Sequence, residues 1–412
     1  MAKYDVAIIG AGLGGLATAA LLAGRRKKTV VIERGASYSG AVGFQERDNF
    51  RFSCAPPLSY GFERGLPVYE MSVGLGILHH AAVTSPCYQV ALPDRRITVY
   101  ADVSETLEEL RREFPREIDS LAQFYKDLHK VAERSARNRF FSFLSKHRTA
   151  AGFMRGYRFS RELTTFFDVQ LDYFFQRPSA ETSLASLISL CDSPPLYFYG
   201  GFKKVADQLY SVILQQSGEV HYGEPSPRIT VHNGRAIEIE TTQGVLEADT
   251  VLLDTVSAQP TSTYFFAVRD EVVPVGMSQE VLYLPAYEQP RDFVSLSLSA
   301  SDDASASPEG MRALRATFRT GPNAVVDQQE RVRRISRLVP FLNDHLIFAE
   351  QYRDITEGAV VPANMPFKMI WSAGGMPLLS RGSCRNLYEL KDMHHAPSWV
   401  LSAVHRFTKQ LK

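Results

Sequence analysis

The sequence lacks any apolar run long enough to span a lipid bilayer, and neither sign of charge is in clear excess. A formal net charge of +1 removes the general electrostatic argument for a nucleic-acid partner. Residues 1–4 lead directly into the first apolar segment and leave no room for a signal peptide, so we expect a cytoplasmic protein. With 412 residues the chain exceeds the size of one ordinary core, and we expect two domains.

Cysteine is also scarce, and its spacing excludes the common metal and redox motifs. The four cysteines lie far apart, form no C-x-x-C pair and do not share zinc-ligand spacing with histidines. This usage fits a reducing compartment and predicts buried structural thiols. The sequence contains no Ser-His-Asp spacing and no phosphate-transfer loop, so it identifies no catalytic residue and no metal ligand. The cysteines are Cys54, Cys87, Cys191 and Cys384.

What the sequence does contain, at its start, is the pattern of a nucleotide-binding βαβ unit. Residues 6–9 form a short apolar run that predicts a buried parallel strand, and residues 29–32 form a second one. Between them lie glycines in G-x-G-x-x-G spacing and a small-residue helical face that ends at Gly24. Glu33 closes the second run at the distance expected of an acid that binds ribose. This context favours a ligand over an ordinary strand–turn–helix.

Each residue type in this unit has a mechanical role. Gly10 makes the tight turn, Gly12 lets the backbone approach a pyrophosphate, and Gly15 allows close helix–strand packing. The helix N-terminus stabilises phosphate charge, and Glu33 accepts a hydrogen bond from a ribose 2′-hydroxyl. Because an acid at the ribose position disfavours a 2′-phosphate, we expect an adenine dinucleotide without that phosphate.

The segments after Glu33 favour a flavin over a nicotinamide. A glycine-containing loop and a predicted hairpin, "RGASYSGAVGFQERDNFRF", follow in place of further alternating strands and helices. The remaining sheet material appears much later, where Asn233-Gly234 predicts a hairpin turn, Gln243-Gly244 a second turn and residues 250–253 a buried strand. The nucleotide domain is therefore predicted to be discontinuous.

At this point the chain resembles a family: the flavin-dependent amine oxidase and phytoene desaturase superfamily, nearest its carotenoid isomerase and retinol saturase branch. The similar segments follow the family's order along the chain, and one of them, "LEELRREFPREIDSLAQFY", resembles that branch's helix around a Phe-Pro-x-Glu core. The segments are residues 43–52, 107–125, 197–213, 334–350 and 386–397.

The resemblance implies FAD and an α/β fold, with a discontinuous Rossmann-like FAD-binding domain and an inserted α+β substrate domain. The boundaries we expect are 1–75, 195–260 and 365–412 for the first domain, and 76–194 and 261–364 for the second. The residues expected to bind the cofactor are Gly10, Gly12, Leu13, Gly14, Gly15, Glu33, Arg34, Gly40, Ser226 and Asp392.

The implied function is that of an FAD-dependent oxidoreductase that desaturates, saturates or isomerises carbon–carbon double bonds in an apolar isoprenoid or carotenoid-like substrate. FAD would accept or donate the hydride while the second domain excludes water. Two alternatives stay open. One is a flavin amine oxidase, and the other is a non-catalytic lipid- or prenyl-binding relative, as the Rab GDP-dissociation inhibitors are in this superfamily.

Four departures from the family's pattern keep the last alternative open. The loop at residues 39–43 offers no charged side chain to a pyrophosphate, and Ser53 and Ala55 replace an acid and a glycine. Lys391 stands where a glycine precedes Asp392, and the C-terminal helix lacks its glycine-rich start. These changes predict either ordinary divergence with FAD retained or a degenerate flavin site.

Two aromatic segments bear on the substrate side. Residues 134–161 contain eight Lys or Arg, no acid and six Phe or Tyr. They predict either a solvated basic face over a buried aromatic stripe or a surface that lies on anionic membrane lipid. Residues 164–177 carry five more aromatic side chains, for which core filling is the preferred interpretation over a tunnel lining. His394-His395 follows Asp392 and invites a catalytic role, although packing is the preferred interpretation.

Overall fold

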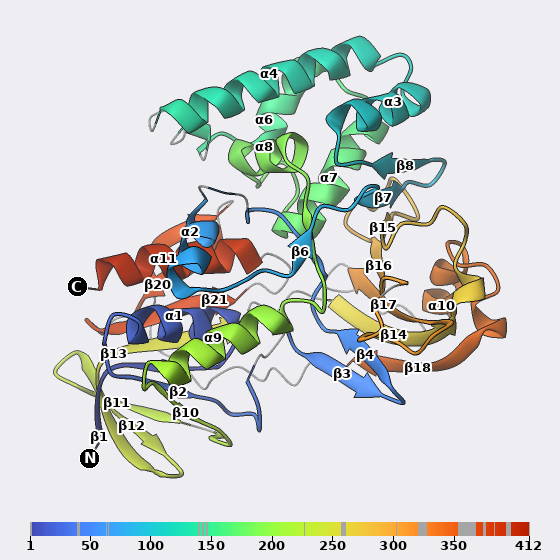
Figure 1. Ribbon diagram of the computed structural model, residues 1–412. Coiled ribbons are helices and arrows are strands. Elements are labelled where there is room, and N and C mark those ends of the chain that lie inside the picture. Colours follow the sequence, from blue (N-terminus) through green and yellow to red (C-terminus); the bar gives the residue numbers. More distant parts are fainter. Residues whose placement is uncertain are drawn as a thin grey trace.

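Two large β-sheets organise the chain (Figure 1). The structure, a computed structural model, describes residues 2–38, 42–62, 64, 66–138, 141, 144–145, 147–225, 227–256, 261–301, 303–319, 328–352, 368–373, 376–382, 384–392 and 397–411.

The first sheet has nine strands, in the order β10-β2-β1-β13-β21-β20-β19, with β12 and β11 attached to β13. The five strands from β10 to β21 are parallel, so their carboxyl ends form one edge where a ligand can bind. The bounds are β1 (Ala2–Ile9), β2 (Thr29–Ile32), β10 (Glu219–His221), β11 (Arg228–His232), β12 (Arg235–Thr241), β13 (Gly244–Val256), β19 (Lys368–Ala373), β20 (Met376–Arg381) and β21 (Leu387–Asp392).

Helices α1 (Leu13–Ala23), α9 (Lys203–Gln215) and α11 (Pro397–Gln410) cover one face of this sheet, with α2 (Pro67–Leu75) against α11 (Figure 1). Helix α1 consists of alanine, leucine, glycine and threonine, and all of its residues are buried. Its small side chains allow the close approach of both neighbouring helices. The other face is covered by the β11–β12 hairpin. The predicted turns of that hairpin and of the start of β13 are confirmed.

The second sheet has seven strands, in the order β18-β14-β17-β16-β15-β7-β8, and is antiparallel except between β7 and β15. It combines an early hairpin with a later block of the chain. Its bounds are β7 (Tyr88–Ala91), β8 (Arg96–Val99), β14 (Thr261–Arg269), β15 (Glu280–Tyr283), β16 (Val294–Leu298), β17 (Met311–Arg319) and β18 (Leu346–Tyr352).

Two small sheets connect the large ones. The predicted hairpin after the second strand is confirmed as β3 (Phe44–Arg47) and β4 (Phe50–Ser53). Its aromatic residues pack on β14 and β17 of the second sheet. The other small sheet contains β5 (Leu58–Ser59), β6 (Ala81–Ala82) and β9 (Leu196–Phe198).

A helical layer packs beyond β7 and β8 (Figure 1). Its longest helix, α4, ends within the basic segment 134–161. The aromatic residues of α7 that were expected to fill a core are all buried, which confirms that interpretation. The helices and helical turns outside the first sheet are α3 (Val103–Glu113), α4 (Ile118–Arg137), α6 (Ala150–Met154), η2 (Arg155–Tyr157), α7 (Arg161–Phe175), α8 (Leu184–Asp192), η3 (Asp270–Val272), α10 (Gln328–Ser336) and η4 (Leu342–Asp344).

One expectation for this layer is wrong: residues 107–125 do not form a single helix. Helix α3 ends before Phe114, and α4 begins at Ile118. Pro115 lies between them, and a proline removes a backbone donor and clashes with the preceding turn of a helix. The Phe-Pro-x-Glu motif therefore marks the joint between two helices, with Phe114 buried beneath it.

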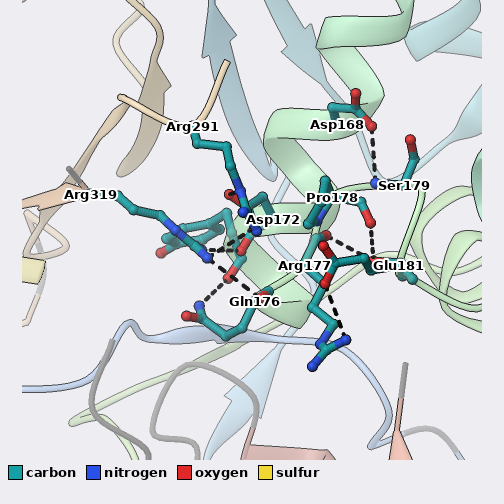
Figure 2. Close-up of polar contacts among 11 residues, drawn as sticks. Asp168, Asp172, Gln176, Arg177, Pro178, Ser179, Glu181, Arg291 and Arg319 are labelled. Atoms are coloured by element: carbon teal, nitrogen blue, oxygen red, sulfur yellow. Dashed lines mark hydrogen bonds and ion pairs between the residues drawn. The ribbon is translucent and has the colours of Figure 1, made fainter. Parts of the chain in front are cut away.

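A buried ion pair ties the helical layer to the second sheet (Figure 2). Asp172 lies on α7 and Arg319 at the end of β17, and their side chains meet at 3.0 Å with less than a tenth of each exposed. Arg319 also donates to the Asp172 carbonyl at 2.7 Å, and Arg291 approaches the carboxylate at 3.7 Å. Burial raises the pKa of Asp172 even though both arginines oppose the shift.

The predicted fold class is confirmed: a Rossmann-like α/β unit is combined with an α+β unit whose strands form a separate sheet. The strands of the first sheet come from residues 2–32, 219–256 and 368–392, as a discontinuous domain requires. The exact domain boundaries stay a prediction. The four cysteines are free and buried, as expected. Among the described helices, none combines the length and apolar character needed to cross a bilayer.

Candidate functional site

The glycine-rich turn lies at the carboxyl edge of the parallel strands, between β1 and α1. Gly10 has a φ of +109°, a conformation that side chains of L-residues rarely adopt. Its amide donates to the Ile32 carbonyl at 2.8 Å, which joins the turn to the end of β2. Gly12 is the N-cap of α1 and has extended backbone. As a glycine it has no side chain that could accept a hydrogen bond from the helix amides. The first turn of α1 contains no acidic residue of its own.

Packing inside the protein accounts for three of the four glycines. A Cβ atom on Gly15 would lie 2.3 Å from the Gly10 carbonyl oxygen, and one on Gly10 would lie 2.7 Å from the carbonyl oxygen of Asp254. A Cβ atom on Gly14 would lie 2.4 Å from the side chain of Leu390 on β21. These distances are shorter than carbon contacts in proteins, so the glycines permit the helix–strand packing that was predicted for Gly15.

Asp254, near the end of β13, was not anticipated as a site residue. Its carboxylate accepts a hydrogen bond from the Gly15 amide at 2.8 Å. A carboxylate at this position interacts favourably with the positive end of the α1 dipole. The helix start where an anionic cofactor is expected therefore already carries one negative charge from the protein.

Glu33 lies at the end of β2, as predicted for the ribose acid. Its carboxylate accepts from the Ala11 amide at 2.6 Å and from the Gly35 amide at 2.8 Å. The two bonds fix the carboxylate beside the glycine-rich turn. Each carboxylate oxygen can accept a further bond, so the group remains able to bind a ribose hydroxyl.

The other predicted cofactor residues are less well placed by the structure. Leu13 and Gly14 open α1 beside Gly12, and Arg34 is half-buried directly after Glu33. Asp392 ends β21, with its backbone paired to Val256 at the same sheet edge as the glycine turn. Its side chain, Gly40, Ser226 and the His394-His395 pair lie outside the described residues.

The residues present fit the adenosine diphosphate part of FAD. A fixed carboxylate, a helix N-terminus and a turn that only glycine can form meet at the edge of parallel strands. Gly12, Leu13 and Glu33 are the residues that would hold this part of the cofactor. Asp254 fits it less well, because its charge repels phosphate.

A pocket lies where the β3–β4 hairpin and β9 meet strands β16 and β17 of the second sheet. It is partly open to solvent, and about 530 Å³ of space between its walls, open solvent included, is not filled by atoms. Its lining combines apolar and polar side chains from both sides of this junction. The described lining includes the apolar residues Phe44, Phe52, Ala55, Phe198, Leu298 and Ala313 and the polar residues Arg51, Ser299, Asp303 and Ser305.

Sequence segments that resemble the family's motifs meet in this pocket. Ser53 and Ala55 line it together with Gly200 and Gly201 of the "YFYGGF" segment. The two glycines have φ values of +71° and +62°, so both need the freedom of glycine. The Ser53 hydroxyl, at the position where the family's pattern predicts an acid, donates to the Ala55 carbonyl at 2.7 Å and faces its own chain.

A row of polar side chains crosses three strands at the wall of the pocket. Glu280 on β15, Ser297 on β16 and Arg315 on β17 are direct cross-strand neighbours, so their side chains share one face. The Glu280 carboxyl group accepts from the Ser297 hydroxyl at 2.5 Å and from the Tyr173 hydroxyl at 2.6 Å. Burial raises the pKa of Glu280 to about 7, against the lowering effects of Arg315 and the two hydroxyls.

Three of the four described aromatic residues of the basic segment 134–161 face inward, and the fourth, Phe141, is 40% exposed. Phe153, Tyr157 and Phe159 are half-buried and pack around Phe124. This packing accounts for these aromatics as core residues, as the solvated-face interpretation predicts, and contact with a membrane stays a prediction.

His79 packs on Phe62 and bonds to the Ser72 hydroxyl at 2.6 Å, and burial lowers its pKa. In the described part of the chain no cluster of His, Cys, Asp and Glu is arranged to hold a metal ion.

Some of the residues missed from sequence had a visible signal. Asp254 directly follows a predicted buried strand, at the edge where ligands bind in such sheets. Arg312, Arg315 and Arg319 interrupt a largely apolar strand, and buried arginines need a partner or a function. Glu280 had no comparable signal, because its environment depends on helix α7.

Comparisons with known proteins agree with this geometry. Residues 8–72 match the family model of the NAD(P)-binding Rossmann-like domain. The chain is 25% identical over 280 residues to the chloroplastic prolycopene isomerase of Daucus carota, which covers 59% of this chain and 44% of that protein. It is 22% identical over 272 residues to a 4,4'-diapophytoene desaturase of Methylomonas sp, covering 60% and 53%. The chain thus spans about half the length of these curated relatives.

Among solved structures, an oxidoreductase from Methanosarcina mazei matches with a TM-score of 0.70 and 17% identity, over 99% of this chain and 100% of that one. This match shows the fold along the whole chain. The curated relatives confirm the predicted resemblance to the phytoene desaturase superfamily near its carotenoid isomerase branch. Both are enzymes, in agreement with the predicted class of FAD-dependent oxidoreductases.

Proposed function

We propose that this chain is an FAD-dependent oxidoreductase that acts on carbon–carbon double bonds of an apolar, isoprenoid-like molecule. The observation that carries the proposal is the position of the pocket. Aromatic and aliphatic side chains form part of its lining, and it lies between the segments that follow the βαβ unit and the second sheet. Similarity to a prolycopene isomerase and a diapophytoene desaturase supports this substrate class.

The residues of the chain would bind and orient both FAD and the substrate. Glu33 and the glycine-rich turn would hold the adenosine end of FAD, and the apolar pocket would hold the substrate away from water. When bound, FAD supplies the hydride chemistry. The proposal does not require any of the described side chains to transfer a proton.

The pocket disfavours an amine substrate. The buried guanidinium of Arg315 lies in its wall, and a protonated amine would be repelled there. Among the described residues that line the pocket, Asp303 is the one acid, and it already accepts hydrogen bonds from the amide and hydroxyl of Ser305. The charges of the pocket therefore support double-bond chemistry over amine oxidation.

A second candidate is a lipid carrier without redox chemistry, and Asp254 is the observation that favours it. Its carboxylate bonds to the start of α1, where FAD phosphate charge would lie close by. A carrier would bind the same apolar ligands and would not need the flavin.

The test is turnover by purified protein incubated with FAD. A poly-cis carotene in detergent is supplied under anaerobic conditions with and without a reductant, and the products are separated by chromatography. Isomerised, desaturated or saturated product that requires FAD supports the proposal. Flavin-loaded protein that oxidises a primary amine and leaves the carotene unchanged would point to an amine oxidase, and carotene bound without flavin or product would point to the carrier.

A further inference from the structure

Strand β17 carries three buried arginines, and two of them have carboxylate partners. Arg312 pairs with Asp270 at 2.9 Å, and Arg319 pairs with Asp172 at 3.0 Å (Figure 2). Arg315 lies between them along the strand and is 3% exposed. Within the described part of the chain its guanidinium forms no ion pair, and its hydrogen bonds go to the Cys54 carbonyl at 3.3 Å and the Ser297 hydroxyl at 3.2 Å.

A buried cation without an anion is costly, and the guanidinium has donor capacity to spare. Arginine carries five N–H donors, of which these two bonds use two. Its Nε atom is buried with no hydrogen-bond partner among the described residues. Bringing an anion to such a group recovers part of the cost of burying the charge.

Glu280 offsets the charge of Arg315 only in part. The two groups attract each other, but they form no direct ion pair: the Ser297 hydroxyl bridges them, and the carboxyl group of Glu280 is also held by Tyr173. Burial raises the pKa of Glu280, which weakens it as a counter-charge for Arg315.

The pocket that Arg315 lines is partly apolar: Phe52, Ala313 and Leu298 belong to its lining, together with several serines. The other charged residues of the described lining already have partners. Arg51 is paired with Glu46 at 2.7 Å and is about half exposed, and Asp303 accepts from the amide and hydroxyl of Ser305. A ligand that matches both the apolar part of the lining and the guanidinium has a long apolar body and one terminal acceptor group.

We propose that Arg315 binds the terminal carboxylate of an isoprenoid acid whose hydrocarbon body fills the apolar pocket. This inference rests on the proposed function for the identity of the pocket as the substrate site, and it names the substrate's end group. A planar guanidinium suits a carboxylate because it can offer two parallel N–H donors. A hydrocarbon or an alcohol of the same length fills the pocket but leaves the charge unpaired.

The test compares farnesoic acid with farnesol by calorimetric titration of the purified full chain, with and without FAD. Wild type is expected to bind farnesoate about ten-fold more tightly than farnesol, as a hydrogen-bonded buried charge implies. Arg315→Gln keeps a donor for Ser297 but removes the charge, and it should lose that preference while binding farnesol as before. Arg315→Lys keeps the charge and should retain part of the preference, which covers the case in which the glutamine variant does not fold.

Arg47→Gln is the matched control, because Arg47 lies on the β3–β4 hairpin, is about half exposed and is not among the described residues that line the pocket. Its farnesoate affinity should stay close to that of wild type. Equal affinity of wild type for the two ligands, an unchanged preference in Arg315→Gln, an equal loss in Arg47→Gln, or no binding of either ligand would each overturn the inference. Arg315-dependent farnesoate binding in protein that takes up no FAD would keep the inference and overturn the proposed redox function.

Discussion

The carboxylate of Asp254 accepts a hydrogen bond from the amide of Gly15 at 2.8 Å, inside the turn that is expected to bind a dinucleotide. Asp254 thereby caps α1 from the neighbouring strand and stabilises the turn without any ligand. The same charge weakens the attraction of the helix N-terminus for phosphate. Stability of the empty site and affinity for the cofactor are therefore opposed at this residue.

Asp254→Asn is expected to raise the affinity for FAD. The asparagine amide oxygen can still accept a hydrogen bond from Gly15, but the negative charge near the phosphates is removed. A charge effect of this size should lower the Kd for FAD about two- to ten-fold. Fluorescence titration with FAD measures it. Asp249→Asn is the matched control, because Asp249 lies on the same strand, is largely exposed and faces Lys3. Unchanged or weaker FAD binding in Asp254→Asn would show that the aspartate supports the site.

Breaking the Asp172–Arg319 pair is expected to destabilise the fold strongly. Arg319→Leu leaves a buried carboxylate on α7, a loss of about 3–5 kcal/mol in the free energy of unfolding. Urea unfolding followed by circular dichroism measures this loss. Replacing both partners by Leu should cost less than Arg319→Leu alone, because no buried charge is left unpaired. A single variant as stable as wild type would mean that the pair contributes nothing.

Farnesoate affinity is expected to rise as the pH falls from about 8 to about 6. Glu280 gains its proton as the pH falls through about 7, and the positive field of Arg315 is then no longer offset. The other groups that face Glu280 are Tyr173, Ser297 and Tyr197, whose hydroxyls stay protonated in this range. Titrations across this range in wild type and Glu280→Gln check the effect. The variant should bind with little pH dependence, and a pH slope equal to that of wild type would exclude Glu280 as its source.

The basic surface of segment 134–161 predicts salt-sensitive binding to anionic liposomes. Arg155 and Arg158 are exposed in the structure, whereas Arg161 bonds to the Tyr287 carbonyl and is better left unchanged. Replacing Arg155 and Arg158 by Ser should reduce sedimentation with anionic vesicles, and high salt should release the wild type. If wild type does not sediment at low salt, the segment is a solvated face.

Local patterns were enough to predict the βαβ unit. The apolar runs at residues 6–9 and 29–32 predict strands because both faces of a parallel strand are buried, and Glu33 follows at a fixed distance. The Asn233-Gly234 turn was predictable for a similar reason, since its hairpin needs two residues with positive φ.

The substrate side could not be predicted in the same way. Glu280, Ser297 and Arg315 form a row only because of the register of three antiparallel strands. No single segment of the sequence determines that register. The apolar residues before Asp254 predict a buried strand but assign no role to the acid that follows them. The joint at Pro115 was hidden by a helical pattern on both sides of it.

The flavin content of the purified chain tests the central claim most directly. Protein incubated with excess FAD is freed of unbound cofactor by gel filtration, and its visible absorption spectrum is recorded before and after anaerobic reduction. We expect a yellow protein that bleaches on reduction, and a colourless Gly12→Val variant that keeps the wild-type circular dichroism spectrum, because a branched side chain would block the approach of phosphate to the backbone. Colourless wild-type protein, or equal flavin content in the wild type and the folded variant, would contradict the assignment of this chain as a flavin enzyme.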